Sequence, residues 1–229
     1  MDILLAGKKL MVILVSVLLL FEGGCTVSDS TPAKNAVGIT PLDRLAEGNA
    51  RFAAYRPEHP DADRKHLAEV ASQQHPFAAI VCCADSRVSP ELLFDQGMGD
   101  LFVIRTAGNM IGPLELGSIE YAVAHLGVPL VVVMGHEDCG AIKAYLEGGD
   151  APGHIRDIVD SITQEAEIKA LPLTNANRVD DCVMANVRHA LRQLQTQSGI
   201  TQEKMRKGEL VIAGALYDLH NLKASFFKP

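Results

Sequence analysis

Two short polar runs contain the side chains best suited to chemistry, and each follows a short apolar segment. The first run is CADSR, with Cys83, Asp85 and Arg87, and the second is GHEDC, with His136 and Cys139. Thiolates and imidazole are ligands that suit Zn²⁺, and three protein ligands leave a fourth tetrahedral position for water or a substrate. The two runs together therefore indicate a metal centre of the catalytic kind.

The positions of these residues explain how they could meet. Cys83 ends one apolar run and His136 closely follows another, and the carboxyl ends of parallel strands meet at one edge of a sheet. His136 and Cys139 are three residues apart where a strand gives way to a helix, so one turn can direct both at one point. The helix start also supplies free N–H groups and a positive dipole, which favour a thiolate. Singly, each residue type more often packs than binds metal; the combined set indicates a site.

The apolar pattern predicts the elements that position these runs. Strands buried on both faces are expected where short apolar runs are rich in β-branched residues. These are residues 77–83, 101–104, 130–134 and 210–215. A helix is expected to start at Thr40 and Pro41, and others at 64–72, 114–126, 139–146, 155–168 and 180–197. Alternating strands and helices predict an α/β fold with a mostly parallel central β-sheet flanked by helices.

Composition narrows the class of protein. The 229 residues, 48% of them hydrophobic, suit one sizeable core, so one catalytic domain is expected. The net charge is −7 and the 21 Lys and Arg residues form no basic stripe, which argues against binding nucleic acid. No Gly-x-Gly-x-x-Gly run opens a helix after a strand, which disfavours a dinucleotide-binding oxidoreductase.

The N-terminal segment has the order of an export signal. Lys8 and Lys9 precede an apolar run over residues 10–21, which is too short to cross a bilayer but suits a signal peptide. Cys25 follows two glycines and resembles the lipid-modified cysteine of bacterial lipoproteins, although Glu22 stands where that pattern has an aliphatic residue. We expect a signal over 1–25, a flexible tether over 26–39 and a catalytic domain over 40–229. The expected location is the periplasm or a membrane-anchored state in a bacterial cell envelope. Lipidation of Cys25, ordinary cleavage nearby and an uncleaved anchor all remain open.

The paired motifs resemble the signature of the β-class carbonic anhydrases. That signature is the Cys-x-Asp-x-Arg of residues 83–87 followed by the His-x-x-Cys of residues 136–139. The segments RTAGN (105–109) and ELGSIEY (115–121) are similar to the family's sequence between the two motifs. The resemblance extends from about Pro41 to the end of the chain. One departure is Asn221-Leu222, where the family commonly turns with a glycine.

The resemblance implies the fold of that family and reversible hydration of CO₂ to bicarbonate and a proton. It implies that Cys83, His136 and Cys139 bind Zn²⁺, and that a zinc-bound hydroxide attacks CO₂. Asp85 would orient this hydroxide and Arg87 would hold Asp85, while Gly108 would let the backbone approach the substrate.

A homodimer or a dimer of dimers is expected for two reasons. One is the resemblance itself. The other is the N-terminal helix, whose apolar residues Leu42, Leu45, Phe52 and Tyr55 are expected to need a partner surface.

Two other functions stay open. The same zinc chemistry could hydrolyse carbonyl sulfide or carbon disulfide. A non-catalytic zinc- or bicarbonate-binding envelope protein is the other alternative. Asp85 and Arg87 speak against it, because a structural zinc needs four protein ligands and no orienting pair.

The absence of tryptophan from the chain bears on whether Asp85 pairs with Arg87 or binds the metal at neutral pH. Some members of the family move the motif aspartate onto zinc, in a state associated with bicarbonate in a side pocket that uses a tryptophan before the first zinc cysteine. This chain has no tryptophan, and Ile80 stands three residues before Cys83. Ile80 offers no N–H to a buried anion. We therefore expect Asp85 to stay paired with Arg87. Because side chains alternate along a strand, Cys82 is expected to face the opposite layer from Cys83 as a core residue.

Overall fold

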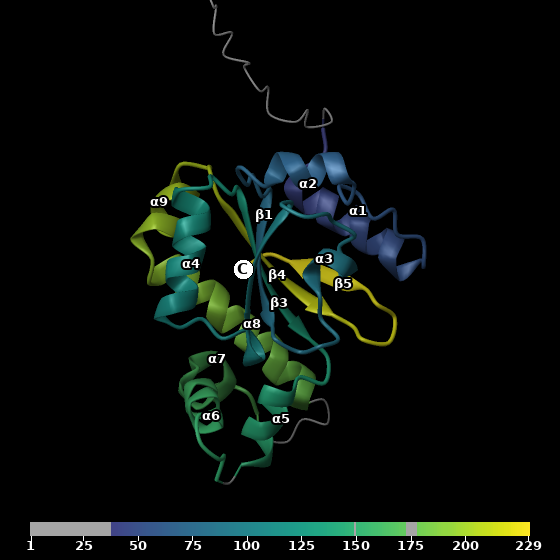
Figure 1. Cartoon of the computed structure of the whole chain (residues 1–229). Coiled ribbons are helices and arrows are strands. Elements are labelled where there is room, and N and C mark those ends of the chain that lie inside the picture. Colours follow the sequence, from purple (N-terminus) through teal and green to yellow (C-terminus); the bar gives the residue numbers. More distant parts are fainter. Residues whose placement is uncertain (1–37, 149, 173–177) are drawn as a thin grey trace, which may run out of the picture. The chain divides into compact units, whose positions relative to one another are not determined.

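The computed structural model describes residues 38–148, 150–172 and 178–229 (Figure 1). The expected signal over 1–25, with Cys25, and tether residues 26–37 lie outside the described residues. Residues Gly38–Pro229 group into one unit. Within the described ranges, no helix is both long and apolar enough to cross a membrane.

A five-stranded sheet with strand order β2-β1-β3-β4-β5 forms the centre of this unit. The strands are β1 (Ala78–Cys83), β2 (Leu101–Thr106), β3 (Leu130–His136), β4 (Val211–Tyr217) and β5 (Ala224–Phe227). The first four are parallel, and β5 pairs antiparallel with β4. Every residue of β1 and of β3 is buried, which explains their continuous apolar sequences. The four predicted strands are confirmed, and β5 was not predicted.

The helices mostly follow the predicted pattern. They are α1 (Pro41–Ala53), α2 (Arg64–Val70), α3 (Pro90–Leu93), α4 (Pro113–Ala124), α5 (Gly140–Glu147), α6 (Ile155–Gln164), α7 (Ala166–Lys169), α8 (Arg178–Thr196) and α9 (Gly199–Arg206), with a 3₁₀ turn η1 (Ala107–Asn109). Thr40 caps α1 as predicted, and Asp43 completes a capping box. The single helix predicted over 155–168 is wrong. Glu165 has extended backbone, with ψ of 123°, and separates α6 from α7.

Helices cover both faces of the sheet (Figure 1). On one face, residues of α4, α8 and α9 pack against Ala79 and Val81 of β1. On the other face, α1 and α3 pack against Ile80 and Cys82. A third cluster lies beyond the carboxyl ends of β1 and β3, where α5, α6, α7 and α8 surround Cys83. Side chains of β1 thus alternate between layers, and its last residue faces the third cluster.

The apolar side of α1 corrects one argument made from the sequence. Leu45 is fully buried inside the chain's own core, and Leu42 and Phe52 pack against the same cluster. Only Tyr55 of the four predicted interface residues is largely exposed, at 81%. The helix therefore finds its cover mainly within its own chain, so its apolar residues give little reason to expect a partner.

Candidate metal centre

The strand order places two predicted ligands at the point where the order of the strands in the sheet reverses. The chain continues from β1 to β2 on one side, and from β3 to β4 on the other, so β1 and β3 are neighbours at the centre. In such sheets, ligands bind outside the carboxyl ends of these two strands. Cys83 is the last residue of β1 and His136 is the last residue of β3.

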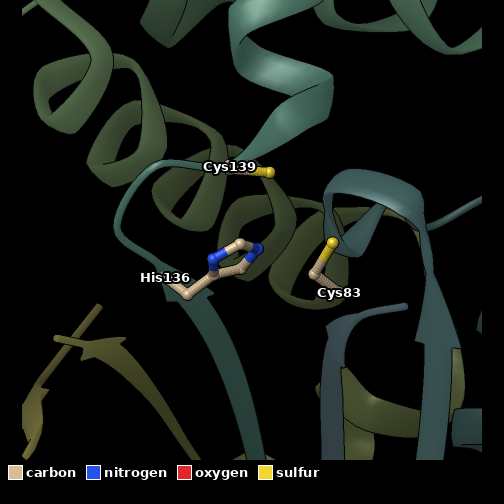
Figure 2. Close-up of side chains that lie close together, drawn as sticks. All are labelled: Cys83, His136 and Cys139. Carbon is tan, nitrogen blue, oxygen red and sulfur yellow. The ribbon is translucent and has the colours of Figure 1, made fainter. Parts of the chain in front are cut away.

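The three predicted metal ligands converge in the structure. The Sγ atoms of Cys83 and Cys139 and a ring nitrogen of His136 lie within 4.8 Å of one another. Figure 2 shows both sulfurs gathered beside the imidazole ring, with Cys139 coming from the start of α5. All three residues are buried. The prediction that two strand ends would bring these side chains together is confirmed.

The hydrogen bonds of His136 fit a metal ligand. Its Nδ1 lies 2.7 Å from the carbonyl oxygen of Glu137, so Nδ1–H donates there and Nε2 keeps a free lone pair. The side chain is fully buried, and Nε2 has no hydrogen-bond partner among the described residues. Burial lowers the pKa of His136, but the neighbouring Cys83 thiolate outweighs it and the net shift is upward. An unpartnered nitrogen beside a thiolate is suited to a cation.

The two sulfurs shift each other's pKa values in opposite directions. The Cys139 thiol beside Cys83, together with His136 and the N–H of Gly108 at 3.3 Å, lowers the pKa of Cys83. The neighbouring Cys83 thiolate and burial raise the pKa of Cys139, although N–H groups of Ala141 and Ile142 at the start of α5 oppose that rise. A metal ion that replaced the Cys139 proton would hold both residues as thiolates. The donor set and its electrostatics therefore fit a soft or borderline divalent ion such as zinc.

Asp85 and Arg87 form a two-pronged ion pair beside the ligands. Arg87 donates from Nε to Oδ1 at 2.9 Å and from Nη2 to Oδ2 at 2.8 Å. These bonds hold the pKa of Asp85 below its ordinary value despite partial burial. The Oδ2 atom lies 3.9 Å from His136 Nε2. The ion pair is present, and an ionised carboxylate faces the ligand cluster; that Asp85 keeps this pair at neutral pH with zinc bound stays a prediction.

Gly108 is placed at the site by its backbone. It has a φ of 68°, and a Cβ there would lie 2.9 Å from the Cβ of Ala141. Its N–H points to Cys83 Sγ, and its carbonyl accepts a hydrogen bond from Asn186 Nδ2 at 3.0 Å. Both backbone groups therefore have protein partners, and contact with a substrate stays a prediction.

Two residues that hydrogen-bond the backbone of the site, Arg105 and Asn186, were not predicted from the sequence. Arg105 donates to the carbonyls of Cys83 and Asp85, at 3.2 and 2.7 Å, and so fixes the backbone between them. Asn186 bonds to the η1 turn from α8. The signal for Asn186 was available, because it is a polar residue among apolar ones on the buried side of a predicted helix.

Among the described residues, the two cysteines outside the ligand cluster are Cys82 and Cys182, and both are buried. Cys82 is fully buried on the opposite side of the sheet from Cys83, together with Ile80, as predicted. Burial raises the pKa of Cys82 to about 12, so it stays a thiol. Cys182 of α8 lies in the third cluster and is also buried.

A second group of potential ligand atoms links β3 to the C-terminal hairpin. It consists of Glu137, Asp218 and His220. Glu137 Oε2 accepts hydrogen bonds from Leu219 N–H at 3.0 Å and lies 2.9 Å from His220 Nδ1. These bonds join the segment after His136 to the turn between β4 and β5, and so help to fix the end of β3.

Comparison with known proteins identifies the family. Residues 78–224 match the family model described as "Carbonic anhydrase". Carbonic anhydrase 2 of Mycobacterium tuberculosis (strain H37Rv) is 43% identical over 184 residues, which cover 79% of this chain and 88% of the relative. The chain therefore belongs to the carbonic anhydrase family.

Solved structures place the chain within the β class. The Coccomyxa β-carbonic anhydrase in complex with acetazolamide has a TM-score of 0.65 at 29% identity, covering 80% of this chain and 85% of that one. One of two tetrameric β-carbonic anhydrases from Sordaria macrospora also has a TM-score of 0.65, at 25% identity, covering 79% and 93%. The fold is that of the β-carbonic anhydrases.

Proposed function

We propose that this chain is a zinc enzyme that catalyses the reversible reaction of CO₂ and water to bicarbonate and a proton. The observation that supports this most directly is the buried Cys83–His136–Cys139 cluster, in which a bare imidazole nitrogen faces two sulfurs. Three protein ligands would leave a fourth tetrahedral position open, and an ionised Asp85 stands next to the cluster, with its Oδ2 3.9 Å from His136 Nε2. Membership of the carbonic anhydrase family supports the same reaction.

In this proposal each residue of the site has its own role. Cys83, His136 and Cys139 would hold Zn²⁺, which would supply Lewis-acid chemistry and lower the pKa of water so that it is a nucleophile at neutral pH. Asp85 is an acceptor only, because it is ionised. Its Oδ2 faces the ligand cluster and can accept the O–H of the attacking water, so that the oxygen lone pair points to CO₂. Arg87 keeps the carboxylate in one orientation through both prongs.

The test is stopped-flow CO₂ hydration on the purified chain, with zinc measured on the same sample. We expect one zinc per chain and hydration well above the uncatalysed rate. Removal of zinc with a chelator should abolish the activity, and added zinc should restore it. A zinc-free chain, or a chain that turns over equally well with and without zinc, would contradict the proposal.

The same samples separate the two alternatives. Stoichiometric zinc without CO₂ hydration, but with hydrolysis of carbonyl sulfide or carbon disulfide, would favour the related hydrolase. Stoichiometric zinc with no activity on any of the three substrates would favour a non-catalytic binding protein. The paired Asp85 and Arg87 argue against the non-catalytic protein, because a structural zinc needs no orienting pair. The choice between CO₂ hydration and the related hydrolysis rests on the substrate assays.

We further propose that the chain is a homodimer or a dimer of dimers. Support comes from the Sordaria macrospora relatives, which are described as tetrameric. Light scattering coupled to gel filtration should give at least twice the chain mass of 24.6 kDa at micromolar concentration. A monomer under these conditions would contradict this assembly.

Export to the cell envelope is proposed from the sequence of residues 1–25. Fractionation of a bacterium that expresses the full chain should place it outside the cytoplasm. Incorporation of labelled fatty acid that is lost in Cys25→Ser would assign the lipid anchor. Recovery of the uncleaved chain from the cytoplasm would contradict export.

A further inference from the structure

The turn that contacts the Cys83 sulfur has an unusual backbone. Gly108 and the following residue, Asn109, both have positive φ, at 68° and 47°. This conformation directs the Gly108 N–H to Cys83 Sγ at 3.3 Å. A backbone donor to a sulfur favours the thiolate and fixes its direction. The Gly108 N–H reaches Cys83 Sγ only while the turn keeps this conformation. A residue that stabilises the turn therefore also fixes the direction of the Cys83 thiolate.

Asn186 of α8 holds this turn from two sides. Its Nδ2 donates to the carbonyl of Gly108 at 3.0 Å, and its Oδ1 accepts from Asn109 Nδ2 at 3.0 Å. Asn186 and Asn109 are 2% and 3% exposed, so water does not compete for these bonds. An amide offers a donor and an acceptor in one plane, which matches the two groups that the turn presents.

Helix α8, which carries Asn186, is held in place by its packing on the sheet. It is 19 residues long and packs on the sheet, where Val183 and Val187 leave no room for a side chain at Gly135 of β3. Gly135 directly precedes His136. The same helix therefore lies against the strand that ends in one ligand and grips the turn that contacts another.

From this geometry, and resting on the zinc site proposed above, we propose that Asn186 is a positioning residue for the Cys83 thiolate. It acts through the backbone of Gly108 and touches neither metal nor substrate. Loss of a group that hydrogen-bonds a metal ligand, here the Gly108 N–H that Asn186 holds in place, typically weakens metal binding by about 10- to 100-fold. Asn186→Leu keeps the branching and the number of side-chain heavy atoms and removes both bonds, so we expect the zinc dissociation constant to rise by about that factor.

A matched control lies on the same helix. Gln193 Nε2 donates to the carbonyl of Ile111, at 3.4 Å, three residues beyond Gly108. Gln193→Leu also removes an amide bond between α8 and this loop, but it leaves the Gly108 turn in place. Its zinc dissociation constant should stay within about twofold of the wild-type value. Asn109→Gly tolerates the positive φ and removes one of the two Asn186 bonds, so its constant should rise by about 3- to 10-fold, the equivalent of one hydrogen bond.

The measurements are chelator competition for zinc, thermal unfolding with and without zinc, and the sulfur-to-metal charge-transfer band of the Co²⁺-loaded protein. A positioning role predicts a weaker zinc-dependent rise in Tm and a shifted Co²⁺ band for Asn186→Leu. If Asn186→Leu does not fold, Asn109→Gly provides the same readouts. Equal losses of Tm with and without zinc, and an unchanged dissociation constant, would overturn the inference. If wild-type chain bound no zinc, the proposed function would fail first and this inference with it.

Discussion

The role of Asp85 can be separated from metal binding by a single substitution. Asp85→Asn keeps the size of the side chain but loses the charge that Arg87 holds in place. We expect the variant to retain zinc and to lose on the order of 10² or more in kcat, because the attacking water is no longer oriented. Cys139→Ser is the control, and it should lose zinc and activity together. Full activity of Asp85→Asn with zinc bound would contradict the assigned role.

Glu165 gives a pH dependence of stability outside the metal site. Its side chain is 1% exposed, and neither carboxylate oxygen has a hydrogen-bond partner in the described part of the chain. Burial, with the nearby charge of Glu167, raises the pKa of Glu165 to about 8. A glutamate in an unfolded chain titrates near about 4.3. Between these two pH values the folded protein holds a proton that the unfolded chain has lost, so the free energy of unfolding falls as pH rises.

Glu165→Gln should remove this dependence. We expect the variant to be only slightly more stable than the wild type in urea unfolding near pH 5 and much more stable than it near pH 9. Glu167→Gln is the control, because the pKa of Glu167 is shifted in the opposite direction and its substitution should lower the free energy of unfolding. Arg192, with His189, lowers the pKa of Glu167 to about 2, and this stability is present above about pH 4.3. Glu167→Gln should therefore be less stable at both pH values by a similar amount. An equal effect of Glu165→Gln at pH 5 and pH 9 would contradict the assignment.

At the scale of elements, the packing of α8 on β3 makes one glycine critical. A Cβ at Gly135 would lie 2.7 Å from Val183 Cγ1 and 2.8 Å from Val187 Cγ2. Gly135→Ala should lower the free energy of unfolding by about 1–3 kcal/mol, because the helix must move away from the strand. Gly117→Ala in α4 is the control. A Cβ there meets nothing within 4 Å, so that variant should gain about 0.5–1 kcal/mol from helix propensity. Urea unfolding of both variants tests the contrast, and an unchanged Gly135→Ala would contradict it.

The central strands could be predicted because a strand that is buried on both faces has a continuous apolar sequence. In β1 and β3 each residue before the predicted ligand is apolar or small, so the strands and the candidate site could be located together. The edge strand β5 was missed because it is four residues long and only partly buried. The turn before it is also unusual, since Leu222 has a φ of 63° where glycine would be expected. Asp218 stabilises that turn by accepting from the N–H groups of His220 and Asn221.

The site was predictable to the extent that its residues are adjacent in sequence to strand ends. Cys83, His136 and Cys139 met as predicted because two neighbouring strands end there. The supporting contact of Asn186 was not predictable, because it depends on how α8 lies against a turn 78 residues away in the sequence. Periodicity shows which side of a helix is buried, but it does not show which loop that side will meet.

For the whole molecule, the location of the proposed metal ligands has a consequence for amide hydrogen exchange. Cys83 and His136 end β1 and β3, two interior strands that have a strand on each side and no exposed residue. Such amides exchange only when the whole unit opens, whereas loop amides exchange by local motion. Chelation should therefore speed exchange in residues 84–88, 107–110 and 137–140 and leave 78–83 and 130–136 protected. Uniform loss of protection would instead mean that the metal holds the fold together. With the expected pattern, the chain could lose its metal and bind it again without unfolding, so the supply of zinc could switch the enzyme off and on.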